Sequence, residues 1–215
     1  ITTEGALTIQ YRSTDKAGNV EDVRESTVRI DKTAPSFTLG VNGDVLDEGG
    51  SFDNILPLTF RVWDDLSGVS FAGTTIGGIE YNMDPKIQSS IDIDLSDKVG
   101  SQTAIIRAQD TAGNILEKTF QFTLTTTIDS MLQLIDRYKE PGDLKEPMGK
   151  ILKNVLNIQQ KMLDKRRPDI AAKLMKYSLK LLDNKGFNKL GLISEKSRRV
   201  LRADGEWLIN EWNNQ

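Results

Sequence analysis

Two hydrophobic periods divide the chain near residue 127. Before that point, apolar and polar residues alternate in short runs, as in Ala6–Tyr11 and Ser26–Ile30. This period of two is typical of β-strands with one buried face. After Thr127 the apolar residues recur at i, i+3, i+4, i+7 and i+10, beginning with Ile128 and ending with Tyr138. The chain therefore consists of a β-rich part followed by an α-helical part.

The β-rich part contains a proline-bearing linker, Asp31–Pro35, because proline cannot donate to a strand ladder. Beyond the linker, turn-rich segments separate further strands, and about seven short strands at such spacing indicate an immunoglobulin-like (Ig-like) sandwich. The expected strands are Ser36–Val41, Leu58–Val62, Gln88–Leu95, Thr103–Ala108 and Lys118–Thr123.

The helical part predicts four amphipathic helices. After the first, Pro147 and Pro168 suit the first turns of the second and third helices, Gly186 ends the third, and Ser194 is a suitable N-cap for the fourth. Four such helices with short links predict a small bundle. The predicted fold is therefore multidomain, with all-β Ig-like sandwich modules followed by an all-α four-helix bundle. Its expected parts are residues 1–35, the C-terminal half of an Ig-like module; 36–126, a whole sandwich; and 127–215, the bundle.

A nine-residue phrase occurs twice in the β-rich part. Tyr11–Asn19, with the sequence YRSTDKAGN, is echoed by Ile106–Asn114, with the sequence IRAQDTAGN. The offset is close to the length of one Ig-like module, which is roughly 100 residues. The first copy lies so near residue 1 that we expect an upstream part of the same polypeptide to complete the sheet of residues 1–35.

Charge and composition exclude several classes of chemistry. Residues 127–215 hold 18 basic and 12 acidic residues, whereas residues 1–126 hold 10 and 19, which supports a boundary between them. The chain has no cysteine and no histidine, so disulfides, thiolate metal sites and histidine-dependent catalytic triads are excluded. No apolar run approaches the roughly 18 residues that a membrane span requires.

The phrase Y-R-S-x-D-x-A-G-N, followed by I-D-x-T-A-P, resembles the bacterial Ig-like repeats of secreted and surface proteins. The match is close over residues 1–35. It is looser over residues 36–126, where Asp64–Val69 and Asp110–Asn114 carry it.

Residues 128–212 resemble the FIMAH domain. The resemblance lies in an Ile-Asp-Ser-Met-Leu helix, a long leucine-rich helix, the segment Ile170–Leu174 and the closing helix Ala203–Trp212. It implies a tail of a large secreted Gram-positive enzyme, often a polysaccharide lyase or glycoside hydrolase, and it assigns no catalytic residue.

The hypothesis is a non-catalytic spacer and attachment region that positions such an enzyme on its substrate or on the cell wall. The alternative is the tail of a surface adhesin without enzymatic activity. Either protein would be secreted or associated with the cell surface.

Two acidic loops are candidates for a calcium site. In an Ig-like topology, the loop after the second strand and the loop after the penultimate strand lie at the same end. Oxygen ligands from these loops suit Ca²⁺, which takes six to eight of them, although acidic residues are also ordinary turn residues. The candidate ligands are Asp64, Asp65, Asp110 and Asn114.

Basic residues of the helical part form a candidate polyanion patch for an anionic polysaccharide or cell-wall polymer, against the alternative of a solvated outer face. The excess of charge is small and lacks interleaved aromatic residues, so nucleic acid is disfavoured. The candidate residues are Lys165, Arg166, Arg167, Arg198, Arg199 and Arg202.

Asp92 and Asp94 lie two apart on one expected strand, which would place both on its solvent face instead of on opposite sides of a sugar bond. The three tryptophans, Trp63, Trp207 and Trp212, are interpreted as packing residues.

Overall fold

A computed structural model describes residues 2–214 and contains two compact units. The first unit comprises Ile1–Thr38, Phe60–Ile91 and Ala104–Thr119, and the second comprises Leu39–Thr59, Asp92–Thr103 and Phe120–Gln215. All helices belong to the second unit, whereas several strands contribute residues to both. The predicted domain boundaries at residues 35 and 126 therefore stay predictions.

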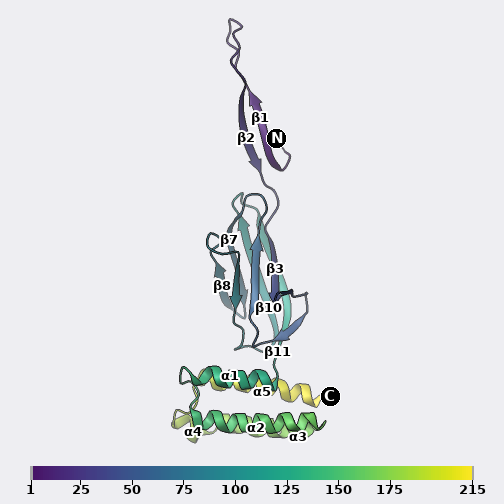
Figure 1. Ribbon diagram of the computed structural model, residues 1–215, viewed down its shortest axis with the longest axis vertical. Helices are drawn as coiled ribbons and strands as arrows, with labels where there is room; N and C mark the ends of the chain where they lie inside the picture. Colours follow the sequence, from purple (N-terminus) through teal and green to yellow (C-terminus); the bar gives the residue numbers. More distant parts are fainter. Residues whose placement is uncertain (1, 215) are drawn as a thin grey trace. The chain divides into compact units, whose positions relative to one another are not determined.

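The first two strands form a hairpin by themselves (Figure 1). Strand β1 (Gly5–Tyr11) pairs antiparallel with β2 (Arg24–Ile30), in a register that runs from Gly5 opposite Ile30 to Tyr11 opposite Arg24. Both strands fall where the period-two pattern predicts them. The completion of this sheet by an upstream segment stays a prediction.

The other nine strands of the described residues form two sheets. One has the order β4-β3-β6-β9 and the other β5-β11-β10-β7-β8. The chain thus has a β-rich N-terminal part and a helical C-terminal part, as predicted, while the Ig-like topology stays a prediction. The strands are β3 (Ser36–Val41), β4 (Asp44–Val45), β5 (Ser51–Asp53), β6 (Leu58–Trp63), β7 (Val69–Ile76), β8 (Ile79–Met83), β9 (Ser90–Ile93), β10 (Gly100–Asp110) and β11 (Ile115–Thr125).

Alternation of buried and exposed residues fixes which side of each strand packs inward. Along β6, Leu58, Phe60 and Val62 are buried, and along β10 the buried positions likewise recur every second residue. In the second unit, the rings of Phe52 and Phe122 stack with centroids 5.6 Å apart. Strands β6 and β10 therefore each contribute one apolar face to a core, as the sequence pattern requires.

The hairpin of β7 and β8 was not among the predicted strands. Ile76 pairs with Ile79 across a two-residue loop, Gly77-Gly78, in which both glycines have positive φ (57° and 79°). Such a loop is typical of a type I′ hairpin, whose twist matches that of the flanking strands. Gly73 interrupts the alternation of apolar and polar residues along β7. An added Cβ at this position would lie 2.5 Å from Asn82 Oδ1, so a larger residue would displace the Asn82 side chain.

Between residues 127 and 214 the structure contains five helices, one more than predicted. They are α1 (Ile128–Lys139), α2 (Glu146–Asp164), α3 (Pro168–Leu182), α4 (Lys185–Lys189) and α5 (Glu195–Asn213). Ser194 caps α5 by accepting a hydrogen bond from the Ser197 N–H at 3.2 Å, as predicted. Gly186 lies inside the short helix α4, beyond the end of α3, so its predicted role as the stop of α3 was wrong.

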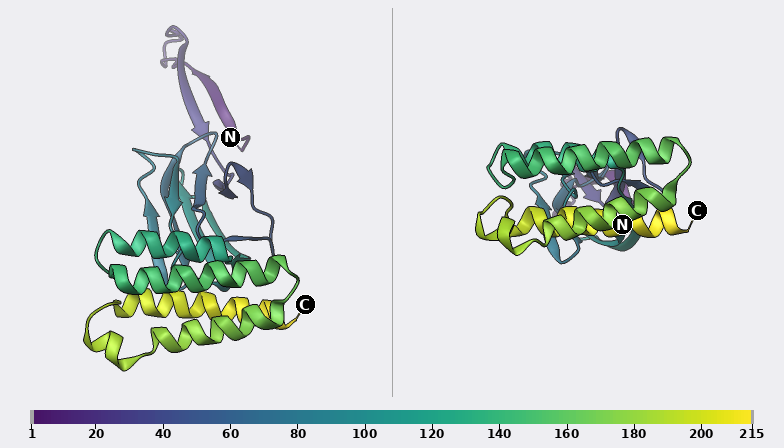
Figure 2. Two further views of the ribbon diagram at one scale, coloured as in Figure 1. Left: turned by 60° about the horizontal axis from the view of Figure 1, so that its bottom comes forward. Right: turned by 90° about the horizontal axis from the view of Figure 1, so that it is seen from below.

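Four long helices pack around one apolar core. Helix α2 lies between α1 and α3, and α3 lies between α2 and α5; viewed from below, α2 and α3 are side by side with α1 and α5 behind them (Figure 2). Gly205 of α5 lies close to α3, since an added Cβ would come within 2.8 Å of Leu179 Cδ2 and 3.1 Å of Met175 Sδ. No helix within residues 2–214 is long and apolar enough to cross a bilayer.

The second unit buries one carboxylate completely. Asp204 of α5 accepts hydrogen bonds from Asn54 Nδ2 at 3.2 Å and Thr126 Oγ1 at 3.3 Å. Burial raises the pKa of Asp204 to about 7, and the charge of Asp53 acts in the same direction, against the two hydrogen bonds. Burial also raises the pKa of Tyr138 to about 12, with Asp204 as the largest charge contribution.

Candidate metal centre at Asp31, Asp64 and Asp110

The two copies of the repeated phrase fold into the same turn. In the first, Asp15 Oδ1 accepts from the Asn19 N–H at 2.9 Å and Oδ2 accepts from Asn19 Nδ2 at 2.7 Å. In the second, Asp110 and Asn114 make the same two bonds at 2.8 and 2.7 Å. The glycine before each asparagine has almost the same positive φ, 94° in Gly18 and 96° in Gly113. The phrase therefore encodes a turn whose aspartate is held by its own asparagine.

The second carboxylate comes from the loop that follows β6. Asp64 Oδ1 accepts from the backbone N–H groups of Leu66, Ser67 and Gly68 at 3.2, 2.8 and 2.7 Å. Gly68 has a φ of 80°, which allows the chain to fold back over the carboxylate. No hydrogen bond to Asp64 Oδ2 occurs within the described residues, so this oxygen is available to a ligand.

The third carboxylate comes from the linker that follows β2. Asp31 Oδ1 accepts from the Thr33 N–H at 3.0 Å, and Asp31 Oδ2 accepts from the Ser67 N–H at 3.1 Å. Hydrogen bonding to Ser67 is the largest influence on the pKa of Asp31, which lies below its usual value although partial desolvation opposes the shift. The linker is thus tied directly to the loop that carries Asp64.

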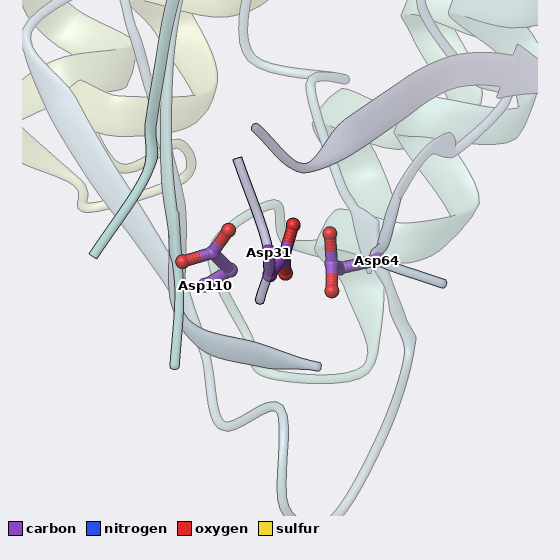
Figure 3. Close-up of side chains that lie close together, drawn as sticks. All are labelled: Asp31, Asp64 and Asp110. Atoms are coloured by element: carbon purple, nitrogen blue, oxygen red, sulfur yellow. The ribbon is translucent and has the colours of Figure 1, made fainter. Parts of the chain in front are cut away.

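These three carboxylates converge within the first unit (Figure 3). One oxygen from each lies within 4.8 Å of the others; Asp110 is buried, and Asp31 and Asp64 are half-buried. No lysine or arginine of residues 2–214 forms an ion pair with any of the three. Three negative charges at such distances repel one another unless a cation lies between them.

The donor set fits a hard divalent cation. Carboxylate and carbonyl oxygens are the ligands that Ca²⁺ takes, at 2.3–2.6 Å and in flexible geometry. The Asp31 and Thr33 carbonyl oxygens lie beside the cluster, since Asn114 Nδ2 donates to them at 3.3 and 3.4 Å. A cavity of about 500 Å³, lined partly by Asp31, Ser67 and Thr111, borders the cluster. Asp31, Asp64 and Asp110 would therefore be the carboxylate ligands of a bound Ca²⁺.

The structure brings together two of the four predicted calcium ligands, Asp64 and Asp110. Asp65 is exposed and lies outside the cluster. Asn114 contacts Asp110 but presents its amide N–H groups, so it orients the carboxylate and is not an oxygen ligand here. Asp31 was missed, although the linker phrase I-D-x-T-A-P placed an aspartate directly after a strand.

The six residues of the predicted polyanion patch do not form one surface. Lys165, Arg166 and Arg167 connect α2 to α3, whereas Arg202 forms an ion pair with Asp183, which directly follows α3. The two groups therefore lie at opposite ends of α3, a helix of 15 residues, or about 22 Å. Arg198 and Arg199 lie on the first two turns of α5, at the same end of the bundle as Arg202. Arg167 also forms an ion pair with Asp169, in which Arg167 Nε lies 3.1 Å from Asp169 Oδ1.

The other candidates have structural roles. Asp92 and Asp94 are exposed on either side of the buried Ile93, as the alternation predicts. Trp212 is buried in the helical core and Trp207 packs against that core. Trp63 is half-buried, with the Arg61 guanidinium 5.6 Å above its ring.

Comparison with known families identifies the helical region. Residues 128–210 match the FIMAH domain, which confirms the resemblance that the helical sequence carries. The Ig-like repeat motif is not matched and stays a prediction. A search of curated protein sequences finds no match.

One solved structure similar to part of this chain is described as a Ca²⁺-stabilized adhesin that helps an Antarctic bacterium reach out and bind ice. The identity is 23%, the match covers 57% of this chain and 32% of the adhesin chain, and the TM-score is 0.28. The chain thus spans about a third of the length of that protein.

Proposed function

We propose that this chain is a non-catalytic spacer and attachment region of a larger secreted bacterial protein. The observation that carries the proposal is the shared carboxylate cluster: the linker after the β1–β2 hairpin supplies Asp31, and the loops of the next module supply Asp64 and Asp110. A linker tied to the following module stiffens a series of modules. The FIMAH domain at residues 128–210 then provides the helical part.

Calcium is the proposed stiffening ligand. A divalent cation held by Asp31 together with Asp64 and Asp110 would link the linker to two loops of the next module and remove the repulsion among the three charges. Binding to the folded chain alone stabilises it by mass action. The linker would then be flexible without calcium and rigid with it.

The resemblance to FIMAH-containing proteins supports a more specific role for the parent protein, as a secreted polysaccharide-degrading enzyme. The chain would position that enzyme on its substrate or on the cell wall, and the basic helical region, with 18 basic and 12 acidic residues after residue 126, would contact an anionic polymer. The catalytic residues of the parent would lie outside residues 1–215.

Calcium binding is tested by melting the chain in EGTA and again with excess calcium. We expect an increase in melting temperature with calcium, and an unchanged melting temperature would contradict the calcium proposal. Magnesium serves as the control, because it demands a stricter octahedral geometry and dehydrates reluctantly.

Two further measurements test the spacer and attachment role. The isolated chain is incubated with a panel of glycans, for which we expect no turnover; any turnover would overturn the non-catalytic assignment. It is then applied at low salt to a heparin or teichoic-acid column, for which we expect retention that salt abolishes. Elution in the void volume would contradict attachment to an anionic polymer.

A further inference from the structure

Helix α2 carries two apolar faces, of which the core uses only one. Met148, Leu152 and Leu156 are buried in the bundle core. A second series, formed by Ile151, Val155 and Ile158, recurs at i, i+4 and i+7 and does not belong to that core. Ile151 is 39% exposed and Ile158 is 46% exposed.

Helix α3 repeats this arrangement. Its buried residues include Met175 and Leu179, whereas Leu174, Tyr177 and Leu181 form a second series at i, i+3 and i+7. Tyr177 is 54% exposed, and Leu174 and Leu181 are half-buried. Both helices are thus apolar over about half of their circumference or more, which is wider than the roughly 100° stripe that packing against a core requires.

The two series face the same side of the bundle. Gln159 of α2 donates to Ser178 of α3 at 3.2 Å, which marks where the helices face each other. Successive residues of a helix are rotated by about 100° around its axis. By this rotation Ile151 and Ile158 lie on the flank of α2 that points away from α1. Leu174 and Leu181 likewise lie on the flank of α3 that points away from α5. The outer face of α2 and α3, which is nearest the viewer in the right panel of Figure 2, therefore carries one apolar strip. The α2–α3 strip consists of Ile151, Val155, Ile158, Leu174, Tyr177 and Leu181.

Cations border this strip on both helices. Lys161 lies one turn from Ile158, and Lys173 and Lys180 lie one turn before and after Tyr177. None of the three forms an ion pair with a residue that the structure describes. The segment from Glu146 to Leu182 holds nine basic and three acidic residues, a net charge of +6.

From this combination we infer that the α2–α3 strip docks on the surface of an anionic lipid bilayer. An apolar face bordered by lysines is the pattern of interfacial helices, which bury the apolar side chains at the acyl boundary while the cations meet lipid phosphates. A second copy of the chain is a poorer occupant, because two surfaces of like charge would meet. A soluble polyanion would leave the aliphatic side chains in water.

The inference adds a lipid surface to the attachment role proposed above and does not rest on calcium. Its test is flotation of the whole chain in EGTA with vesicles of phosphatidylcholine, and with vesicles of equal parts phosphatidylcholine and phosphatidylglycerol. We expect flotation only with phosphatidylglycerol, and its loss at high salt. No flotation, or equal flotation with both vesicles, would overturn the inference.

Matched variants separate the strip from the rest of the surface. Ile158→Gln is expected to weaken partitioning about tenfold, and Lys161→Gln or Lys180→Gln about fivefold each. Ile87→Gln, at an isoleucine 80% exposed on the β-rich part, is the control and should bind like the parent. Ile158 and Ile87 are exposed, and Lys161 and Lys180 are exposed and form no ion pair with a described residue, so unchanged melting temperatures are expected for all four variants. Equal loss in Ile87→Gln, or no loss in Ile158→Gln, would contradict the assignment. Sedimentation that shows a dimer abolished by Ile158→Gln would assign the strip to self-association instead.

Discussion

The Asp204 carboxylate of helix α5 accepts a hydrogen bond from the Asn54 amide, which lies 150 residues earlier in the chain, at a distance of 3.2 Å. Both side chains are fully buried, and Asn54 Oδ1 has no hydrogen-bond partner. A carboxyl group that carries a proton donates as well as accepts. The charge state of Asp204 therefore matters for the stability of the second unit.

The contribution of Asp204 to stability is expected to fall as the pH rises toward neutrality. The pKa of Asp204 is raised from 3.8 to about 7 in the folded chain, so between these values the folded state holds a proton that the unfolded state releases. The contribution is full below pH 3.8 and is lost as the pH approaches 7. The total change is on the order of 4 kcal/mol.

Asp204→Asn tests this expectation. The asparagine keeps the Oδ1 acceptor for Asn54 Nδ2 and places an amide N–H group at the position of Oδ2, where the Thr126 hydroxyl can accept a hydrogen bond instead of donating one. The melting temperature of the variant should exceed that of the parent at pH 8 and be close to it at pH 5. Asp92→Asn, at an exposed carboxylate, is the control. A variant that is less stable than the parent at pH 8 would show that ionised Asp204 is favourable.

Two helical glycines should respond oppositely to alanine. In Gly149→Ala the one close contact of the new methyl group is with Lys139 Cε at 2.9 Å, and Leu144 and Ile135 lie at ordinary contact distances of 3.7 and 3.8 Å. In Gly205→Ala the methyl group instead meets Leu179 Cδ2 at 2.8 Å and Met175 Sδ at 3.1 Å in the core. Alanine raises helix propensity by about 1 kcal/mol at both positions, but overpacking a core costs about 1–3 kcal/mol. Urea unfolding should show Gly149→Ala as neutral or stabilising and Gly205→Ala as destabilising. Equal shifts of the two midpoints would contradict the packing argument.

Asp64→Asn separates the charge of the candidate metal centre from its loop geometry. The asparagine keeps Oδ1 and its three backbone donors, but replaces the available oxygen with an N–H group. In EGTA the variant should be as stable as the parent or more stable by about 1 kcal/mol, because one of three mutually repelling charges is gone.

With calcium, the increase in melting temperature that we expect for the parent should be absent from Asp64→Asn. Asp65→Asn, one residue later and outside the cluster, is the matched control and should keep the full increase. A calcium response retained in Asp64→Asn would remove this carboxylate from the ligand set.

The glycines of the repeated turn should be equally intolerant of substitution. Gly18 and Gly113 both adopt a φ near 95°, with open space around the position of an added Cβ, so alanine is disfavoured by the backbone alone. Each replacement is expected to cost about 1–2 kcal/mol. Hydrogen exchange of the Asn19 and Asn114 amides would report the loss locally. Unchanged protection in either variant would show that the turn tolerates alanine.

Periodicity predicted the elements that have a strong apolar pattern. The stripe of Ile128 to Tyr138 and the prolines at residues 147 and 168 placed three helices correctly, because those signals are local. The β7–β8 hairpin was missed because small residues such as Ala72 and Gly73 weaken its alternation, although Gly77-Gly78 is a recognisable hairpin loop. Tertiary contacts, not local preference, decide such strands.

The candidate metal centre was predictable only in part. Asp64 follows β6 and Asp110 is the last residue of β10, and an Ig-like topology predicts that these two strand ends lie at the same end of the sandwich. Asp31 joins them through the path of the linker, which the Ser67 N–H fixes by a hydrogen bond. Contacts between residues 36 positions apart leave no periodic signal in one sequence. The role of Asn114 as an N–H donor depends on its amide orientation, which sequence alone does not define.

The connection between β11 and α1 has a mechanical consequence. Strand β11 ends at Thr125 and α1 begins at Ile128, and Thr127 in between already accepts a hydrogen bond from the Ser130 N–H at 3.1 Å. Two residues span at most about 7 Å, so the connection cannot lengthen appreciably when the chain is pulled. A pulling force transmitted along β11 would reach the first turn of α1 directly, and that turn would bear the load before any other part of the helical domain.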